Sequence, residues 1–145
     1  MSHSTIFRLA FLSFALSMAA CTDIDDVQRA VSEAESEVGA HQTIIDRSTS
    51  LTAAHVELDR HADAIDGDMQ RIRNRLDDVD DTCDTDRRGV WATVYDLEAQ
   101  VEVYLVEANR VTDLRALRTA SDDYRADMES ELATLSNRLD DLPCW

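Results

Sequence analysis

The fold is decided by LTAAHVELDRHADAIDGDMQRIRNRLDDVDDTC, residues 51–83. Core-compatible residues recur in this stretch at alternating spacings of three and four, which is the period of one face of an α-helix. A stripe kept over more than about four heptads indicates coiled-coil-like packing along the whole helix. The predicted stripe comprises Leu51, His55, Leu58, Ala62, Ile65, Met69, Ile72, Leu76, Val79 and Cys83.

Three further stretches carry the same helical pattern, one before residues 51–83 and two after them. The alternating segment VEVYLVE, residues 101–107, is also taken as helix, because the chain has no evident partner strand. Three glycines and one proline are too few turn formers for the hairpins of a sandwich or barrel. The stripes comprise Ile24, Val27, Val31, Ala34, Val38, His41 and Ile45; Val90, Val94, Leu97, Val101, Tyr104, Ala108 and Val111; and Met128, Leu132, Leu135, Leu139 and Leu142.

Short polar segments separate these stripes. We expect connections at residues 48–50 and 119–121, with Ser50 and Ser121 as helix N-caps, and an end to the last helix at Pro143. Short connections make consecutive helices antiparallel. The sequence therefore predicts an all-α fold, an antiparallel up-down-up-down four-helix bundle with coiled-coil-like packing.

The N-terminus has the features of an export signal. Arg8 precedes a 12-residue apolar run, residues 9–20, which is shorter than the roughly 20 residues of a membrane-spanning helix. Met18-Ala19-Ala20-Cys21 then resembles the lipobox of bacterial lipoproteins. The resemblance implies removal of residues 1–20, a diacylglyceryl thioether on the Cys21 sulfur and acylation of the new amino group. The alternative is an ordinary signal peptide, cut after Ala19 or Ala20, that leaves Cys21 as a thiol.

On the lipoprotein interpretation, residues 21–145 form a single helical domain held at a bacterial membrane by acyl chains such as palmitate. Thr22 follows the cysteine, whereas Asp there retains lipoproteins in the inner membrane of enteric bacteria. We therefore expect the outer membrane, with the domain facing the periplasm or the cell surface. The net charge of −16 excludes nucleic acid and anionic lipid headgroups as partners.

Two cysteines remain in the expected domain. Cys83 ends the second predicted helix and Cys144 follows the fourth, and these ends lie on the same side of an up-down-up-down bundle. An exported compartment permits disulfides. The sequence therefore predicts a Cys83–Cys144 bond.

The candidate residues for a metal site are His41 and His55, which both fall on predicted core stripes, seven residues either side of Ser48. A metal site would be built from such facing positions. However, Glu-x-x-His pairs are absent, the nearest spacings being Glu37-x-x-x-His41 and Glu57-x-x-x-His61, and the other hairpin places Arg115 and Arg125 at the matching level. We expect hydrogen-bonded core histidines, no cofactor and no catalytic site, with His41 and His55 as the metal-binding alternative.

The third predicted helix has a second apolar side, formed by Tyr95, Ala99, Val103 and Val106. This side either contacts a neighbouring helix of the bundle or binds another molecule, through self-association or to an envelope protein. The sequence thus favours a non-enzymatic, lipid-anchored structural or protein-interaction module. A bundle that binds metal or a small ligand at the His41/His55 end is the alternative function.

Overall fold

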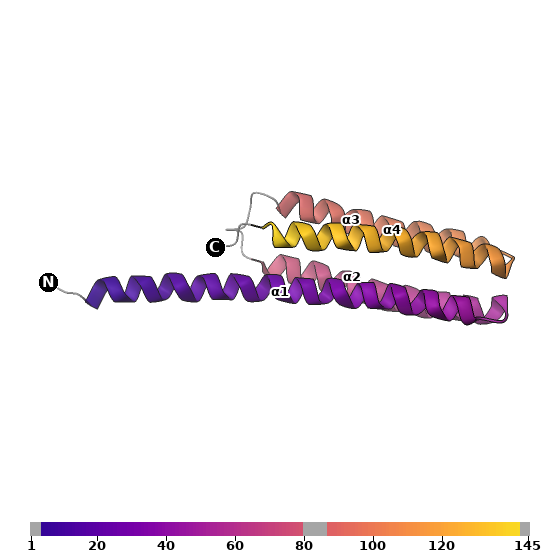
Figure 1. Cartoon of the computed structure of the whole chain (residues 1–145), viewed down its shortest axis with the longest axis horizontal. Helices are drawn as coiled ribbons and strands as arrows, with labels where there is room; N and C mark the ends of the chain where they lie inside the picture. Colours follow the sequence, from indigo (N-terminus) through magenta and orange to yellow (C-terminus); the bar gives the residue numbers. More distant parts are fainter. Residues whose placement is uncertain (1–3, 80–86, 143–145) are drawn as a thin grey trace.

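The computed structural model describes the backbone of residues 4–79 and 87–142, with the side chains of these residues from residue 24 onward. The described chain forms four long helices and confirms the predicted all-α bundle (Figure 1). Each helix packs against its neighbour in the chain, and the first also packs against the fourth, which is the arrangement of an up-down-up-down bundle. The helices are α1 (Ser4–Arg47), α2 (Leu51–Asp78), α3 (Arg87–Arg110) and α4 (Leu114–Asp140).

The core follows the predicted stripes closely in three of the four helices. From Val27 to Ile45 the α1 stripe is buried, as are the α3 stripe from Val90 to Ala108 and the α4 stripe from Met128 to Leu142. The segment 101–107 is helical, as predicted, and Val101 and Tyr104 face the core from it. The helices hold together because these aliphatic side chains leave water, at about 25 cal/mol per Å² of apolar surface buried.

The α2 stripe differs from the prediction at two places between residues 54 and 62. Ala54 and His61 are fully buried in the core, whereas His55 and Ala62 are only partly buried. Ala62 is more apolar than His61, so hydrophobicity alone favours the wrong face. His61 lies inside because both of its ring nitrogens have hydrogen-bond partners there.

The two short connections lie at the same end of the bundle. Ser50 caps α2 as predicted, because its side chain accepts a hydrogen bond from the Ala53 backbone N–H at 3.1 Å. The prediction of Ser121 as the N-cap of α4 is wrong: Asp113 caps that helix, and Ser121 lies buried inside it. There its hydroxyl donates a 2.5 Å hydrogen bond to the side chain of Gln42 on α1.

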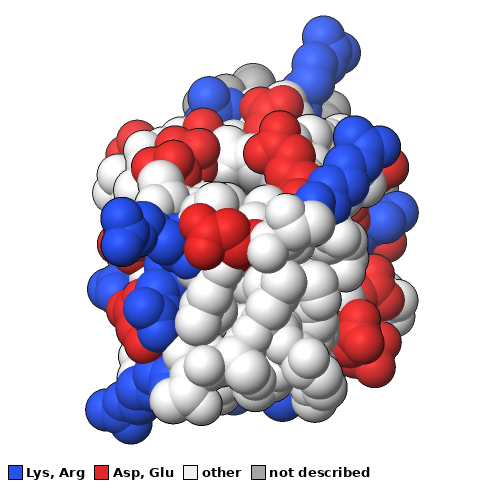
Figure 2. Space-filling model, turned by 90° about the vertical axis from the view of Figure 1, so that its right-hand side faces the viewer, with Lys and Arg blue, Asp and Glu red and all other residues white. Residues whose placement is uncertain are grey.

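Viewed from this end, the bundle shows a broad uncharged area flanked by charged side chains (Figure 2). This uncharged area is consistent with the sequence around the α1–α2 connection, because residues 48–56 contain no Asp, Glu, Lys or Arg. Elsewhere the surface is rich in carboxylates and arginines.

Both chain ends lie toward the opposite end, where α2 ends and α3 begins (Figure 1). The predicted Cys83–Cys144 bond and Pro143 fall outside the described residues, and so does the side chain of Cys21. Among the described residues, no helix contains a stretch long and apolar enough to cross a membrane.

Candidate functional site

A cluster of histidine and tyrosine side chains, one from each helix, occupies the core between the middle of the bundle and the end with the short connections. The imidazoles of His41 on α1 and His61 on α2 stack with ring centroids 4.0 Å apart and an interplanar angle of 16°. The phenol rings of Tyr104 on α3 and Tyr124 on α4 stack at 4.0 Å and 7°. Each imidazole meets its tyrosine edge-on at 5.6 Å. We refer to these four residues with Glu37, Glu57 and Arg60 as the polar centre.

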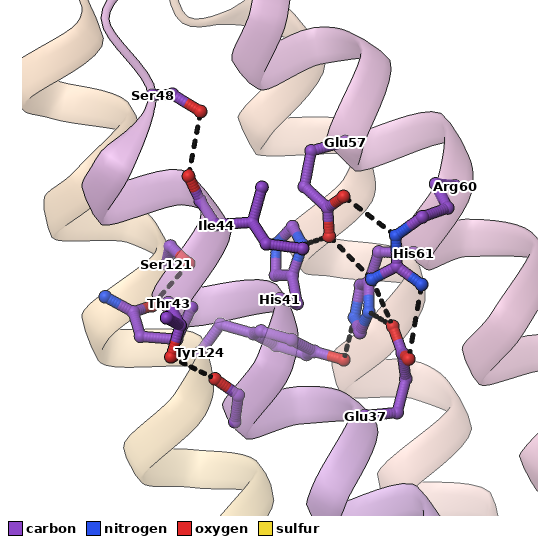
Figure 3. Close-up of polar contacts among 12 residues, drawn as sticks. Glu37, His41, Thr43, Ile44, Ser48, Glu57, Arg60, His61, Ser121 and Tyr124 are labelled. Atoms are coloured by element: carbon purple, nitrogen blue, oxygen red, sulfur yellow. Dashed lines mark hydrogen bonds and ion pairs between the residues drawn. The ribbon is translucent and has the colours of Figure 1, made fainter.

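Two hydrogen-bonded relays run through the polar centre. In the first, His41 Nε2 lies 2.6 Å from the Tyr104 hydroxyl and His41 Nδ1 lies 3.1 Å from Glu57 Oε1. In the second, His61 Nε2 lies 3.0 Å from the Tyr124 hydroxyl and His61 Nδ1 lies 2.9 Å from Glu37 Oε1 (Figure 3). Each relay joins side chains from α1, α2 and one further helix, which is α3 in the first relay and α4 in the second. The relays therefore connect the α1–α2 hairpin to the α3–α4 hairpin.

The partners of each imidazole specify its proton position. A carboxylate can only accept a hydrogen bond, so Nδ1 of both histidines carries the proton and donates it. Nε2 then accepts from the tyrosine O–H. The same tautomer satisfies both relays while the histidines are neutral, and neutrality also avoids two stacked cations in a buried site.

Arg60 supplies the positive charge of the polar centre. Its guanidinium bonds Glu37 through Nη2 at 2.8 Å and Glu57 through Nη2 at 2.6 Å and Nε at 2.8 Å (Figure 3). The two carboxylates, which would otherwise repel each other, therefore share one cation.

The environment shifts the pKa values of the polar centre in directions that preserve these bonds. Burial, with the neighbouring His61, lowers the pKa of His41 to about 4, and burial also lowers the pKa of His61. Burial alone would raise the pKa values of Glu37 and Glu57, but hydrogen bonds from Arg60 and the histidines outweigh it and lower them. Burial raises the pKa of Tyr104 to about 12. At neutral pH the tyrosines are thus protonated donors rather than activated nucleophiles.

The predicted pairing of His41 with His55 is not the arrangement that the structure shows. His41 stacks on His61, and both of its ring nitrogens are already hydrogen-bonded. His55 is partly buried on the first turns of α2, and its Nε2 has no hydrogen-bond partner in the described part of the chain. Arg115 and Arg125, expected at the same level of the second hairpin, are exposed, and the tyrosines lie there instead. Among described side chains, no three His, Cys, Asp or Glu residues are grouped to hold a metal ion.

The sequence contains a signal for the polar centre in the spacing of its glutamates, histidines and tyrosines. The spacing Glu-x-x-x-His occurs at Glu37–His41 and again at Glu57–His61, 20 positions later, and Tyr104 and Tyr124 are also 20 positions apart. In an antiparallel hairpin two such pairs place each glutamate beside the other helix's histidine. The repeated spacing therefore predicts crossed Glu–His pairs, as observed.

A surface groove lies between α3 and α4, on the outer side of the stacked Tyr104 and Tyr124 rings. It has a volume of about 840 Å³, and Tyr104 and Tyr124 both line it. Val103, from the predicted second apolar side of α3, also lines it and is 57% exposed. The polar centre thus fixes, from inside, two of the side chains that form this groove.

Comparison of the chain with protein-family models, with curated proteins and with solved structures gives no match.

Proposed function

We propose that this chain is a lipid-anchored helical module of the bacterial cell envelope that binds another protein, with no catalytic role of its own. The observation that carries the proposal is the apolar side of α3. Tyr95, Val103 and Val106 are 55%, 57% and 45% exposed, although the core side of the same helix is closed. A row of large apolar side chains exposed along one helix is typical of a protein-interaction surface.

The polar centre supports this function by giving the bundle a fixed shape. Directional hydrogen bonds between helices select one alignment of the helices, whereas aliphatic contacts tolerate sliding. A module that presents a surface to a partner gains affinity when that surface is already ordered.

The lipid anchor rests on the lipobox-like residues Met18 to Cys21. Expression in a bacterial host with and without globomycin, followed by mass spectrometry of the product, tests it. We expect a chain that begins at Cys21 and carries acyl chains, and accumulation of the unprocessed form with the inhibitor. An unmodified soluble product would refute the anchor.

Site-specific crosslinking in intact cells tests the binding role. A photo-crosslinking amino acid at Val106 is compared with the same group at Glu35, an exposed position on α1. We expect a discrete crosslinked product from position 106 alone. Equal patterns from both positions, or no product from either, would contradict a role for this side of α3.

A further inference from the structure

The α3–α4 groove is shaped to accept a helix. Small side chains, Ala99 on α3 with Ala116 and Ala120 on α4, line it beside Val103. Small residues let another helix approach closely. The α4 lining extends from Arg115 to Glu131, about 24 Å at 1.5 Å per residue, which matches a helix of some 16 to 18 residues.

The rim of the groove carries a negative charge that the groove itself does not balance. Of the described residues, six carboxylates and one guanidinium, that of Arg115, line the groove. The carboxylates are those of Asp96, Glu107, Asp113, Asp123, Asp127 and Glu131. The groove between α1 and α2 differs, because Arg29 and Arg71 lie among its carboxylates and Arg71 pairs with both Glu33 and Asp68. The α3–α4 groove is thus complementary to a cationic ligand.

Gln100 adds a hydrogen-bond acceptor to this groove. Its side-chain oxygen is buried without a hydrogen-bond partner in the described part of the chain, although the residue lines the groove. A buried acceptor without a partner is unfavourable, and a donor from a bound ligand would remove that cost.

We propose that the α3–α4 groove binds a basic amphipathic helix of another protein, with the apolar face of that helix against Val103 and the alanines and its Lys or Arg residues against the rim. The proposal rests on the protein-binding function above and names the class of partner. A second copy of this chain is disfavoured as the occupant, since it would bring two acidic rims together in a chain of net charge −16.

The probe is a synthetic 18-residue peptide with Leu and Ala on one helical face and Lys on the other, and the control peptide has Glu in place of every Lys. Binding to the full chain in phosphatidylcholine nanodiscs is followed by fluorescence anisotropy, with empty nanodiscs subtracted. We expect a micromolar Kd at low salt for the Lys peptide, at least tenfold weakening in 0.3 M salt, and no binding of the Glu peptide. Binding of both peptides, or of neither, would overturn the proposal.

Matched variants locate the binding. Val103→Asp is expected to weaken binding at least tenfold, and Asp123→Asn with Asp127→Asn severalfold. The controls are Val56→Asp, at a valine that is 66% exposed on α2, and Asp59→Asn with Asp63→Asn, which have the same four-residue spacing. We expect the controls to bind like the unmodified chain, with circular dichroism showing intact helices throughout. Equal losses in the groove and control variants would indicate general attraction to an acidic surface and would refute the groove.

Two further outcomes separate this proposal from the proposed function. If the position-106 crosslink persists unchanged in Val103→Asp cells while that variant no longer binds the peptide, the protein-binding function stands and the groove is not the site of the native partner. If sedimentation equilibrium shows a dimer that Val103→Asp dissociates, a second copy occupies the groove and the basic partner is wrong.

Discussion

The two halves of the bundle are built by different means. In the half near the chain termini, which we call the aliphatic half, the core consists almost wholly of Val, Ile, Leu, Met and Ala, with Ile72, Leu97 and Leu135 fully buried. In the half near the short connections, the polar half, two histidines, two tyrosines and two glutamates lie between the helices. Burial of aliphatic side chains is non-directional, whereas a hydrogen bond fails when its partner moves by an ångström or two. The aliphatic half therefore supplies most of the free energy of folding, and the polar half supplies the register between the helices.

The largest expected effect tests the energetic role of the aliphatic half. Leu135→Ala removes a fully buried side chain from α4 and leaves a cavity. We expect the free energy of unfolding to fall by about 3 kcal/mol, within the usual range of about 2 to 5 kcal/mol. Urea unfolding followed by circular dichroism measures it. A loss below about 1 kcal/mol would show that this half is loosely packed and would contradict its energetic role.

Acid should weaken the polar half first. The unfolded imidazole titrates near 6.5, and the folded pKa of His41 is about 4, so the unfolded state binds more protons throughout this window. The free energy of unfolding therefore falls as the pH drops from 7 to 4, by roughly 3 kcal/mol from His41, and the lowered pKa of His61 acts in the same direction. Below about pH 4.5, protonation of Glu37 and Glu57 adds a further loss, because their folded pKa values are also lowered.

Urea unfolding at a series of pH values measures this dependence, and the His41→Gln variant is its control. The variant should lose stability at pH 7 yet show a shallower slope between pH 7 and 5. An unchanged slope would assign the acid sensitivity to groups outside the polar centre.

Breaking the His61–Tyr124 hydrogen bond should have a smaller effect on the free energy of unfolding. A double variant shows how much of that effect comes from leaving one polar group without its partner. Tyr124→Phe leaves His61 Nε2 without its donor, and His61→Leu leaves the Tyr124 hydroxyl without its acceptor. We expect the tyrosine change to cost about 1 to 2 kcal/mol. The double variant should cost less than the sum of the two single changes, with a coupling of about 1 kcal/mol, since it leaves neither group unsatisfied. Additive costs would mean that the His61–Tyr124 bond contributes nothing.

The smallest expected change in the free energy of unfolding comes from replacing a glycine inside a helix by alanine, and it should be equal in the two halves. Gly39 and Gly67 lie inside helices, and a Cβ added at Gly39 meets no atom within 4 Å, while one at Gly67 meets only an Arg71 side-chain nitrogen at 3.8 Å. Each change to alanine should raise the free energy of unfolding by about 0.5 to 1 kcal/mol, because alanine loses less backbone entropy in a helix. Thermal unfolding checks this. A loss of stability for Gly39→Ala alone would show that the polar half needs local freedom that the static contacts do not reveal.

The sequence predicts the aliphatic half better than the polar half, for a physical reason. Apolar periodicity locates residues such as Ile72 and Leu135 because only burial matters there. Apolar periodicity leaves His61 off the core stripe, and the preference of serine for N-caps puts Ser121 outside α4. The burial of both residues depends on partners in distant parts of the chain, Tyr124 and Gln42. Those partners become evident only when the helices are assembled.

The sequence likewise predicts one part of the candidate interaction surface and not the other. The second apolar side of α3 is predictable from the spacing of Tyr95, Val103 and Val106, and these residues are exposed. The groove beside it also depends on α4, and a connection was expected at residues 119–121, in what is the second turn of that helix, so the shape and rim charge of the groove emerge only from the fold. The crossed Glu–His pairs could have been predicted from the repeated Glu-x-x-x-His spacing.

The central claim is that two neutral Tyr–His–Glu relays fix the polar half of the bundle. The most direct test is nitrogen NMR of the His41 and His61 imidazoles in the folded full chain, titrated from pH 7.5 to 3.5. We predict the neutral, Nδ1-protonated tautomer for both at pH 7, and a midpoint for His41 near 4. An Nε2-protonated tautomer, or a His41 midpoint near 6.5, would contradict the relays.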